Sequence, residues 1–126
     1  MRDVASFSFD HSSSAPRAAR RFVADTLDAW GLDHMAEDVV LLVSELVSNV
    51  IHHTDQAPAL EISRVGDHLR CAVVDFGGVA PSRRTPTPSE RTGRGLQLVD
   101  TLAATWGSNT TTGRNEVWFE VPIRRR

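Results

Sequence analysis

The segment spanning residues 45–53 concentrates side chains that could do chemistry. It reads ELVSNVIHH and holds Glu45, Asn49, His52 and His53. In a helix, Glu45 and Asn49 lie one turn apart, and Asn49 and His53 lie at the border of an apolar stripe. A buried amide or imidazole at this border costs about 1–3 kcal/mol unless it is hydrogen-bonded. The segment therefore needs a partner, which is either a ligand or, in a structural interpretation, the last helix carbonyls contacted by the two histidines.

A second candidate lies where a predicted strand ends. By the two-residue alternation of a strand, Cys71, Val73 and Asp75 share one face, so a carboxylate ends an apolar row. Gly77 and Gly78 follow directly and allow positive φ angles and the close approach of a ligand. The sequence predicts either a ligand-facing carboxylate or an ordinary turn at this point.

A third candidate is the sequence Gly93-Arg94-Gly95, which precedes a predicted helix. The backbone N–H groups in the first turn of a helix are free, and bare glycines beside them form a potential anion site. An ordinary glycine-rich helix start is the alternative interpretation.

Periodicity places these motifs on an α+β fold. Apolar stripes predict helices over residues 16–30, 33–53 and 94–104, the first capped by serines and the last ended by Gly107. Alternation predicts strands over residues 4–9, 60–65, 69–75, 105–109 and 116–123, with a lid at about 82–92 and a solvated tail at 124–126. This order predicts one domain over residues 1–126, a two-layer sandwich of a mostly antiparallel sheet with helices on one face.

The composition favours a single cytoplasmic domain. The chain has 126 residues, a formal charge of −2, 40% hydrophobic residues, and 14 basic against 16 acidic side chains. This balance of charge argues against direct binding of nucleic acid through its phosphates. One cysteine, Cys71, excludes an internal disulfide and a multi-thiolate metal site and indicates a reducing compartment. No stretch reaches the roughly 18 apolar residues of a membrane span, so we expect no membrane association.

Together, the three motifs could supply a metal ligand, a reader of the base and a cradle for phosphates. Their order and spacing resemble the N box (ELVSNVIHH), the G1 box (VVDFGG) and the G2 box (ERTGRGLQLV) of one ATP-binding fold. That fold, the histidine kinase-like ATPase or GHKL fold, is shared by histidine kinases, Hsp90, gyrase B and MutL. The resemblance is strongest to the stand-alone bacterial anti-sigma-factor serine kinases, and it covers nearly the whole chain.

The resemblance implies a role for each matched residue. Asn49 would hold a Mg²⁺ ion that bridges the ATP phosphates, and Glu45 would be the general base for a substrate serine. Asp75 would accept a hydrogen bond from the exocyclic amine of adenine, and Gly77 would leave room for the ring. The rest of the implied nucleotide-binding set is Gly93 and Gly95, which would wrap the phosphates, with His53, Arg94 and Leu96.

The same resemblance implies an ATP-dependent regulator. It would phosphorylate a serine of an anti-anti-sigma antagonist protein and sequester a sigma factor or similar transcription factor by partner switching, with Arg20 on the first helix binding the partner. One alternative is a catalytically silent, nucleotide-gated protein-binding module. Others are a structural interaction domain that binds no nucleotide and, as a lesser variant, a detached histidine-kinase catalytic domain. The oligomeric state stays open between a monomer and a homodimer.

Overall fold

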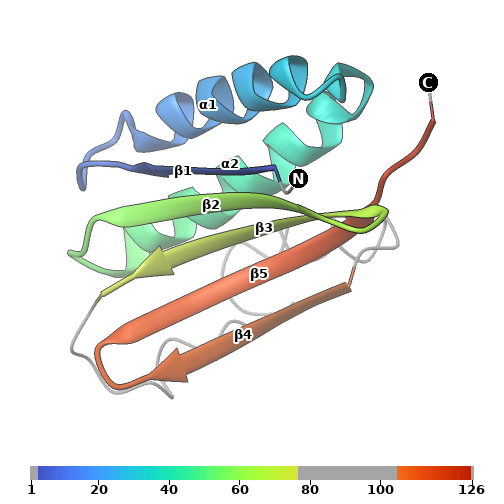
Figure 1. Cartoon of the computed structure of the whole chain (residues 1–126). Helices are drawn as coiled ribbons and strands as arrows, with labels where there is room; N and C mark the ends of the chain where they lie inside the picture. Colours follow the sequence, from blue (N-terminus) through green and yellow to red (C-terminus); the bar gives the residue numbers. More distant parts are fainter. Residues whose placement is uncertain (1–2, 77–104, 126) are drawn as a thin grey trace.

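Two helices cover one face of a five-stranded sheet in the computed structural model, which describes residues 3–76 and 105–125 (Figure 1). This arrangement confirms the predicted α+β fold. The predicted helix over residues 94–104 and the lid over residues 82–92 lie outside the described residues. In chain order the elements are β1 (Val4–Ser8), α1 (Ala15–Ala29), the short 3-10 helix η1 (Asp33–Met35), α2 (Ala36–His53), β2 (Pro58–Val65), β3 (His68–Asp75), β4 (Thr105–Thr111) and β5 (Arg114–Pro122).

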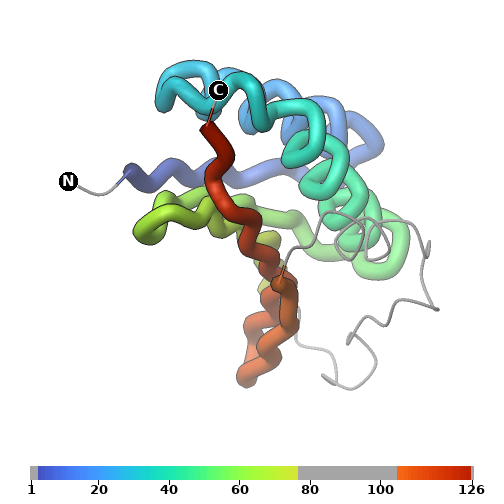
Figure 2. The backbone as a smooth tube through the Cα atoms, turned by 90° about the vertical axis from the view of Figure 1, so that its right-hand side faces the viewer, coloured from blue at the N-terminus to red at the C-terminus, as the bar shows by residue number. Residues whose placement is uncertain are grey.

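All neighbouring strands of the sheet run antiparallel. Their order is β1-β2-β3-β5-β4, so β5 lies between β3 and the edge strand β4. The hairpin between β2 and β3 turns at Gly66, whose φ of +61° is a conformation that favours glycine. Figure 2, turned by 90°, shows both helices on the same side of the sheet. One sheet face is therefore covered by helices over β1, β2 and β3.

The hydrophobic core lies between the helices and the sheet. Each helix presents a stripe of small and branched apolar residues at helical spacing, and each central strand presents alternate residues to the same layer. Burying these side chains holds the helices on the sheet, because each removes apolar surface from water. The most buried members are Ala19, Val23, Leu27, Val39, Leu42, Val43, Val47, Leu60, Ile62, Leu69, Cys71 and Phe119.

The opposite face of the sheet carries a polar network. The Arg70 guanidinium lies 5.0 Å from the ring centre of Trp118 and 3.8 Å from carboxylate oxygens of Glu116 and Glu120. The Trp118 ring also packs against Gly107, where an added Cβ would approach Cζ2 to 2.8 Å. The prediction that Gly107 ends a helix is therefore wrong. This glycine lies inside β4 and makes room for the indole.

Both helices start close to the predicted residues, but the local structure of each start differs from the prediction. Ser14 makes no side-chain cap on α1; its backbone N–H instead donates to Ser12 Oγ over 3.1 Å. The second helix begins with a tight 3-10 turn over Asp33–Met35, and the α-helix starts only at Ala36. The reason is the sharp reversal at Gly31, with φ at +74°, after which Leu32 and Met35 are both buried.

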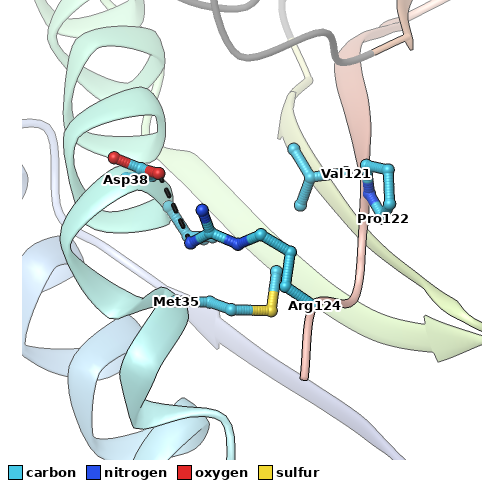
Figure 3. Close-up of a pocket in the computed structure, with 6 residues that line it drawn as sticks. Met35, Asp38, Val121, Pro122 and Arg124 are labelled. Carbon is cyan, nitrogen blue, oxygen red and sulfur yellow. Dashed lines mark ion pairs between the residues drawn. The ribbon is translucent and has the colours of Figure 1, made fainter. Parts of the chain in front are cut away.

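The C-terminal segment, predicted as a solvated tail over residues 124–126, is exposed at Arg124 and Arg125, but Arg124 also contacts η1 and the start of α2. His34 Nε2 donates to the Arg124 carbonyl over 2.6 Å, and the Arg124 guanidinium lies 3.6 Å from the Asp38 carboxylate. These contacts close one side of a small cavity of about 130 Å³ (Figure 3). Its other lining residues are Met35, Val39, Val121 and Pro122. The apolar lining explains why the segment folds back here instead of extending into water.

The burial of Cys71 leads to the first testable prediction. Burial raises the pKa of the Cys71 thiol, although the nearby Arg70 charge opposes this shift. Because the thiolate is the nucleophile, a thiol reagent should label only unfolded chains, a fraction of about 10⁻³–10⁻⁶ under native conditions. The measurement is the labelling rate with and without denaturing guanidinium. Rapid stoichiometric labelling of the folded protein would contradict the position of Cys71 in the core.

Candidate functional site

Three elements bring polar residues to the same end of the sheet. In the strand register, Asp75 at the end of β3 stands between Pro58 at the start of β2 and Asn115 near the start of β5. Helix α2 reaches this end too, because only a short turn separates His53 from β2 (Figure 1). We call the end that carries Pro58, Asp75 and Asn115 the site end of the sheet. The candidate site lies here, under the C-terminal half of α2.

Asp75 is the buried carboxylate at this end. It lies on the helix-facing side with Cys71 and Val73, as the strand alternation predicts, and is 3% exposed. Asn115, itself 6% exposed, donates a hydrogen bond from Nδ2 to Asp75 Oδ1 over 3.1 Å. Asn115 Oδ1 is buried and accepts no hydrogen bond from the residues that the structure describes. Asn115 was not predicted as a site residue, because its pairing with Asp75 depends on the register of β3 and β5.

Glu45 and Asn49 lie one turn apart on α2, as predicted, and both are half-buried. Asn49 Oδ1 is buried and has no hydrogen-bond donor within the described part of the chain. His53 is exposed, because the last turn of α2 extends beyond the buried stripe that ends at Val47. The predicted position at the border of the core therefore holds for Asn49 and not for His53.

The end of α2 is capped by a residue that the sequence analysis missed. His11, in the turn between β1 and α1, approaches the carbonyls of Thr54 and Ile51 with Nε2, at 2.7 and 3.1 Å. Carbonyls only accept, so Nε2 carries the proton and is shared between them. Thr54 Oγ1 donates to the carbonyl of Val50 over 2.9 Å. The alternative interpretation of the sequence was that His52 and His53 contact the last carbonyls of the helix. Among the described residues, the side chains that contact the carbonyls of Val50, Ile51 and Thr54 are those of His11 and Thr54.

The remaining predicted residues lie on α1 or beyond the described residues. Arg20 is exposed on α1, with Arg17 and Arg21 also exposed beside it. The glycine predicted to leave room for the adenine ring, Gly77, lies outside the described part of the chain. So do the other predicted nucleotide-binding residues Gly93, Arg94, Gly95 and Leu96.

The described side chains include one oxygen that suits a metal ion held jointly with a ligand, and no complete metal site. Over residues 3–76 and 105–125, no cluster of three or more His, Cys, Asp or Glu side chains is placed to hold a metal. A Mg²⁺ ion that arrives with nucleotide phosphates needs only one or two protein ligands, and these are oxygens. Asn49 Oδ1, a buried oxygen without a donor among the described residues, fits that requirement. In the same part of the chain, neither helix has the length and apolar character to cross a membrane.

The sequence model of the histidine kinase-like ATPase domain matches residues 10–121. The chain therefore belongs to the histidine kinase-like ATPase domain family. A comparison with curated proteins finds no significant match.

Solved structures share this fold over most of the chain. The RsbU and RsbW domains of Rv1364c from Mycobacterium tuberculosis align with 97% of this chain, at 19% identity and a TM-score of 0.65. The histidine kinase domain of the blue-light-activated kinase EL346 from Erythrobacter litoralis aligns with 71%, at 26% identity and a TM-score of 0.57. The chain spans only 33% and 45% of those two structures. A nucleotide-free catalytic domain of the histidine kinase ThkA aligns over 98% of this chain and 99% of its own, at 14% identity and a TM-score of 0.58.

The His11 cap predicts a measurable loss of stability. Replacing His11 with Ala removes the side-chain donor from the carbonyls of Ile51 and Thr54. We expect the free energy of unfolding to fall by about 0.5–1.5 kcal/mol. The measurement is the denaturant midpoint at an unchanged slope.

His52→Ala is the matched control for this prediction. His52 is exposed on the last turn of α2 and makes no hydrogen bond or ion pair with any described residue. Its replacement should leave the midpoint within about 0.5 kcal/mol of the parent. If the two variants unfolded at the same midpoint, the capping role of His11 would be wrong.

Proposed function

We propose that the chain binds Mg·ATP at the site end of the sheet. The observation that carries this proposal is the buried Asn49 Oδ1, which has no donor among the described residues and lies one turn after Glu45. A buried acceptor without a partner costs about 1–3 kcal/mol, which a bound cation would offset. Asn49 would hold Mg²⁺, which neutralises phosphate charge when it is bound. The family to which the chain belongs supports the choice of ATP.

Asp75 supplies the recognition of the base in this proposal. Its carboxylate is buried on the helix-facing side of β3 and held by Asn115 Nδ2. A buried carboxylate accepts hydrogen bonds, and the exocyclic amine of adenine donates them. The arrangement favours an aminopurine over a base that presents a carbonyl oxygen at this point.

We further propose that the domain is an anti-sigma-type serine kinase. In this reaction a serine Oγ of the antagonist attacks the γ-phosphorus, the bond to the bridging oxygen of ADP breaks, and the serine proton passes to the Glu45 carboxylate. Glu45 is half-buried on the same helix as Asn49 and one turn away. The general base and the residue that would hold Mg²⁺ are thereby kept in a fixed relation, on which phosphoryl transfer largely depends.

The partner surface is proposed on the exposed face of α1. Arg17, Arg20 and Arg21 present three positive charges to solvent on this helix. Such a patch steers an acidic surface, here that of a sigma factor or similar transcription factor. The fold shared with the RsbW domain of Rv1364c supports a regulator of this type. The sequence resemblance to anti-sigma-factor serine kinases supports the proposal that an antagonist protein is its substrate.

ATP binding can be tested by calorimetry in the presence of magnesium. Asn49→Ala should abolish magnesium-dependent binding, because no other buried side-chain oxygen on α2 lacks a donor among the described residues. Asp75→Asn should weaken ATP binding by about 10- to 100-fold. The asparagine amide replaces one acceptor oxygen with an NH₂ donor, which would face the donor amine of adenine. Asn109→Ala, on the exposed edge strand, is the control and should bind as the parent does. No heat of ATP binding by the parent at any magnesium concentration would overturn the site assignment.

The kinase reaction can be separated from ATP binding at Glu45. Glu45→Gln removes the proton acceptor but keeps the size of the side chain. We expect serine labelling of a co-purifying antagonist to fall by about 10²–10⁴-fold, with ATP affinity close to that of the parent. The measurement is phosphoserine formation by mass spectrometry.

The matched control for this reaction is Glu37→Gln, at the exposed first turn of α2. It should phosphorylate the antagonist at the rate of the parent. If the parent binds ATP and the antagonist together but forms no phosphoserine, the kinase proposal fails and a nucleotide-gated binding module takes its place.

A further inference from the structure

We infer that the cavity between the start of α2 and the end of β5 binds a free α-amino acid with an apolar side chain. The cavity has a volume of about 130 Å³ (Figure 3). β5 carries Asn115 at the site end of the sheet and lines the cavity with Val121 and Pro122, roughly 20 Å further along the strand. The inference is therefore separate from the proposed binding of ATP.

The walls of the cavity are apolar and limit the size of a ligand. Met35, Val39 and Val121 are almost completely buried, and Pro122 completes the apolar lining. An apolar cavity of about 150 Å³ holds a benzene molecule, so this one has room for an apolar group of about four to six carbon atoms. The unbranched side chain of Met35 can adapt to its shape. The walls therefore suit an aliphatic side chain and exclude the larger indole of tryptophan.

Asp38 and Arg124 bring opposite charges to the same cavity. The Asp38 carboxylate and the Arg124 guanidinium lie 3.6 Å apart, which is longer than the about 2.7–2.9 Å of a charge-assisted hydrogen bond (Figure 3). Their side chains are 40% and 59% exposed, and exposed ion pairs stabilise a protein little. Each of the two groups therefore keeps hydrogen-bonding capacity for a ligand, and a ligand that separates them loses little.

The backbone of Arg124 is held in place without the ion pair. The Arg124 carbonyl accepts a hydrogen bond from His34 Nε2 over 2.6 Å. The N–H of the preceding Ile123 donates to the Asp67 carbonyl over 2.8 Å. A ligand can therefore come between the two charged groups without releasing the C-terminal segment, and binding does not have to order that segment first.

Two opposite charges select a ligand that carries both. A simple carboxylic acid would pair with Arg124 but face the like charge of Asp38, and a simple amine would face the like charge of Arg124. An α-amino acid brings its ammonium to Asp38 and its carboxylate to Arg124, whose guanidinium can donate two parallel hydrogen bonds. Its side chain then enters the apolar cavity and leaves water. Leucine has both charges and a side chain of the required size.

Calorimetric titration of the full chain with leucine at neutral pH tests the inference. We expect a dissociation constant of about 0.1–1 mM, in the range open to so small a ligand. Two analogues keep the aliphatic chain but lack one charge each: isocaproate has no ammonium, and isoamylamine has no carboxylate. Both should bind at least about 10-fold more weakly, because each leaves a charged group of the protein unpaired. Glycine, which has no side chain, should give no measurable binding.

Charge-neutral variants test the two groups that would hold the ligand. Asp38→Asn and Arg124→Gln should each weaken leucine binding by at least about 10-fold. Glu37→Gln and Arg125→Gln are the matched controls, because each removes the same charge from an exposed neighbour in the sequence. Both controls should bind leucine as the parent does.

Met35 reports whether leucine enters the cavity, and this readout keeps the test valid if a charge variant does not fold. The chain has two methionines, of which Met35 lines the cavity. In NMR spectra of isotope-labelled methionine methyl groups, the Met35 resonance of the parent should shift as leucine is added. Three results would each overturn the inference: no leucine binding up to about 10 mM, a single-charge analogue that binds as tightly as leucine, or leucine binding that leaves the Met35 resonance unmoved. Charge variants that bind leucine like the parent would overturn it as well.

Discussion

The arrangement of the site depends on the burial of one carboxylate at the end of an apolar strand. Asp75 continues the row of Cys71 and Val73 toward the helices, so it cannot turn to water without losing the strand register. A carboxylate in such a place requires hydrogen-bond donors. β5 brings Asn115 to it, which requires β5 to lie beside β3 rather than beyond β4. The burial of Asp75 therefore depends on the strand order, because only a strand beside β3 can bring a donor to its carboxylate.

Much of this could be predicted from the sequence, because it is carried by local periodicity. The stripes of α1 and α2 and the alternation of β3 placed Asp75 on the covered face, and helical spacing placed Glu45 and Asn49 one turn apart. The two residues that the sequence analysis missed are of another kind. His11 and Asn115 each contact partners 40 or more residues away in the chain. No local pattern signals such a pairing, since it follows from the register and from the packing of a loop on a helix end.

The same reason explains the errors at the ends of elements. Glycine often ends a helix, but Gly107 lies within β4, where the Trp118 ring of the neighbouring strand β5 leaves no room for a side chain. Arg124 belongs to a charged terminus, yet it is held by Asp38 and by His34, 90 residues away. In both cases a tertiary contact, which no local pattern signals, fixes the conformation of the segment.

Helix α2 is held at both ends by such distant contacts. The C-terminal segment contacts Asp38 in its first turn and His34 in the preceding η1, and His11 contacts the carbonyls at its end. Between these anchors the buried valines and leucines give the helix its stability, so Glu45 and Asn49 need not contribute to it. A helix stabilised in this way can keep a carbonyl oxygen buried and unpaired within the described structure, at a cost of about 1–3 kcal/mol. The backbone that carries Asn49 is thereby ordered before any ligand arrives, and binding need not include the entropic cost of ordering it.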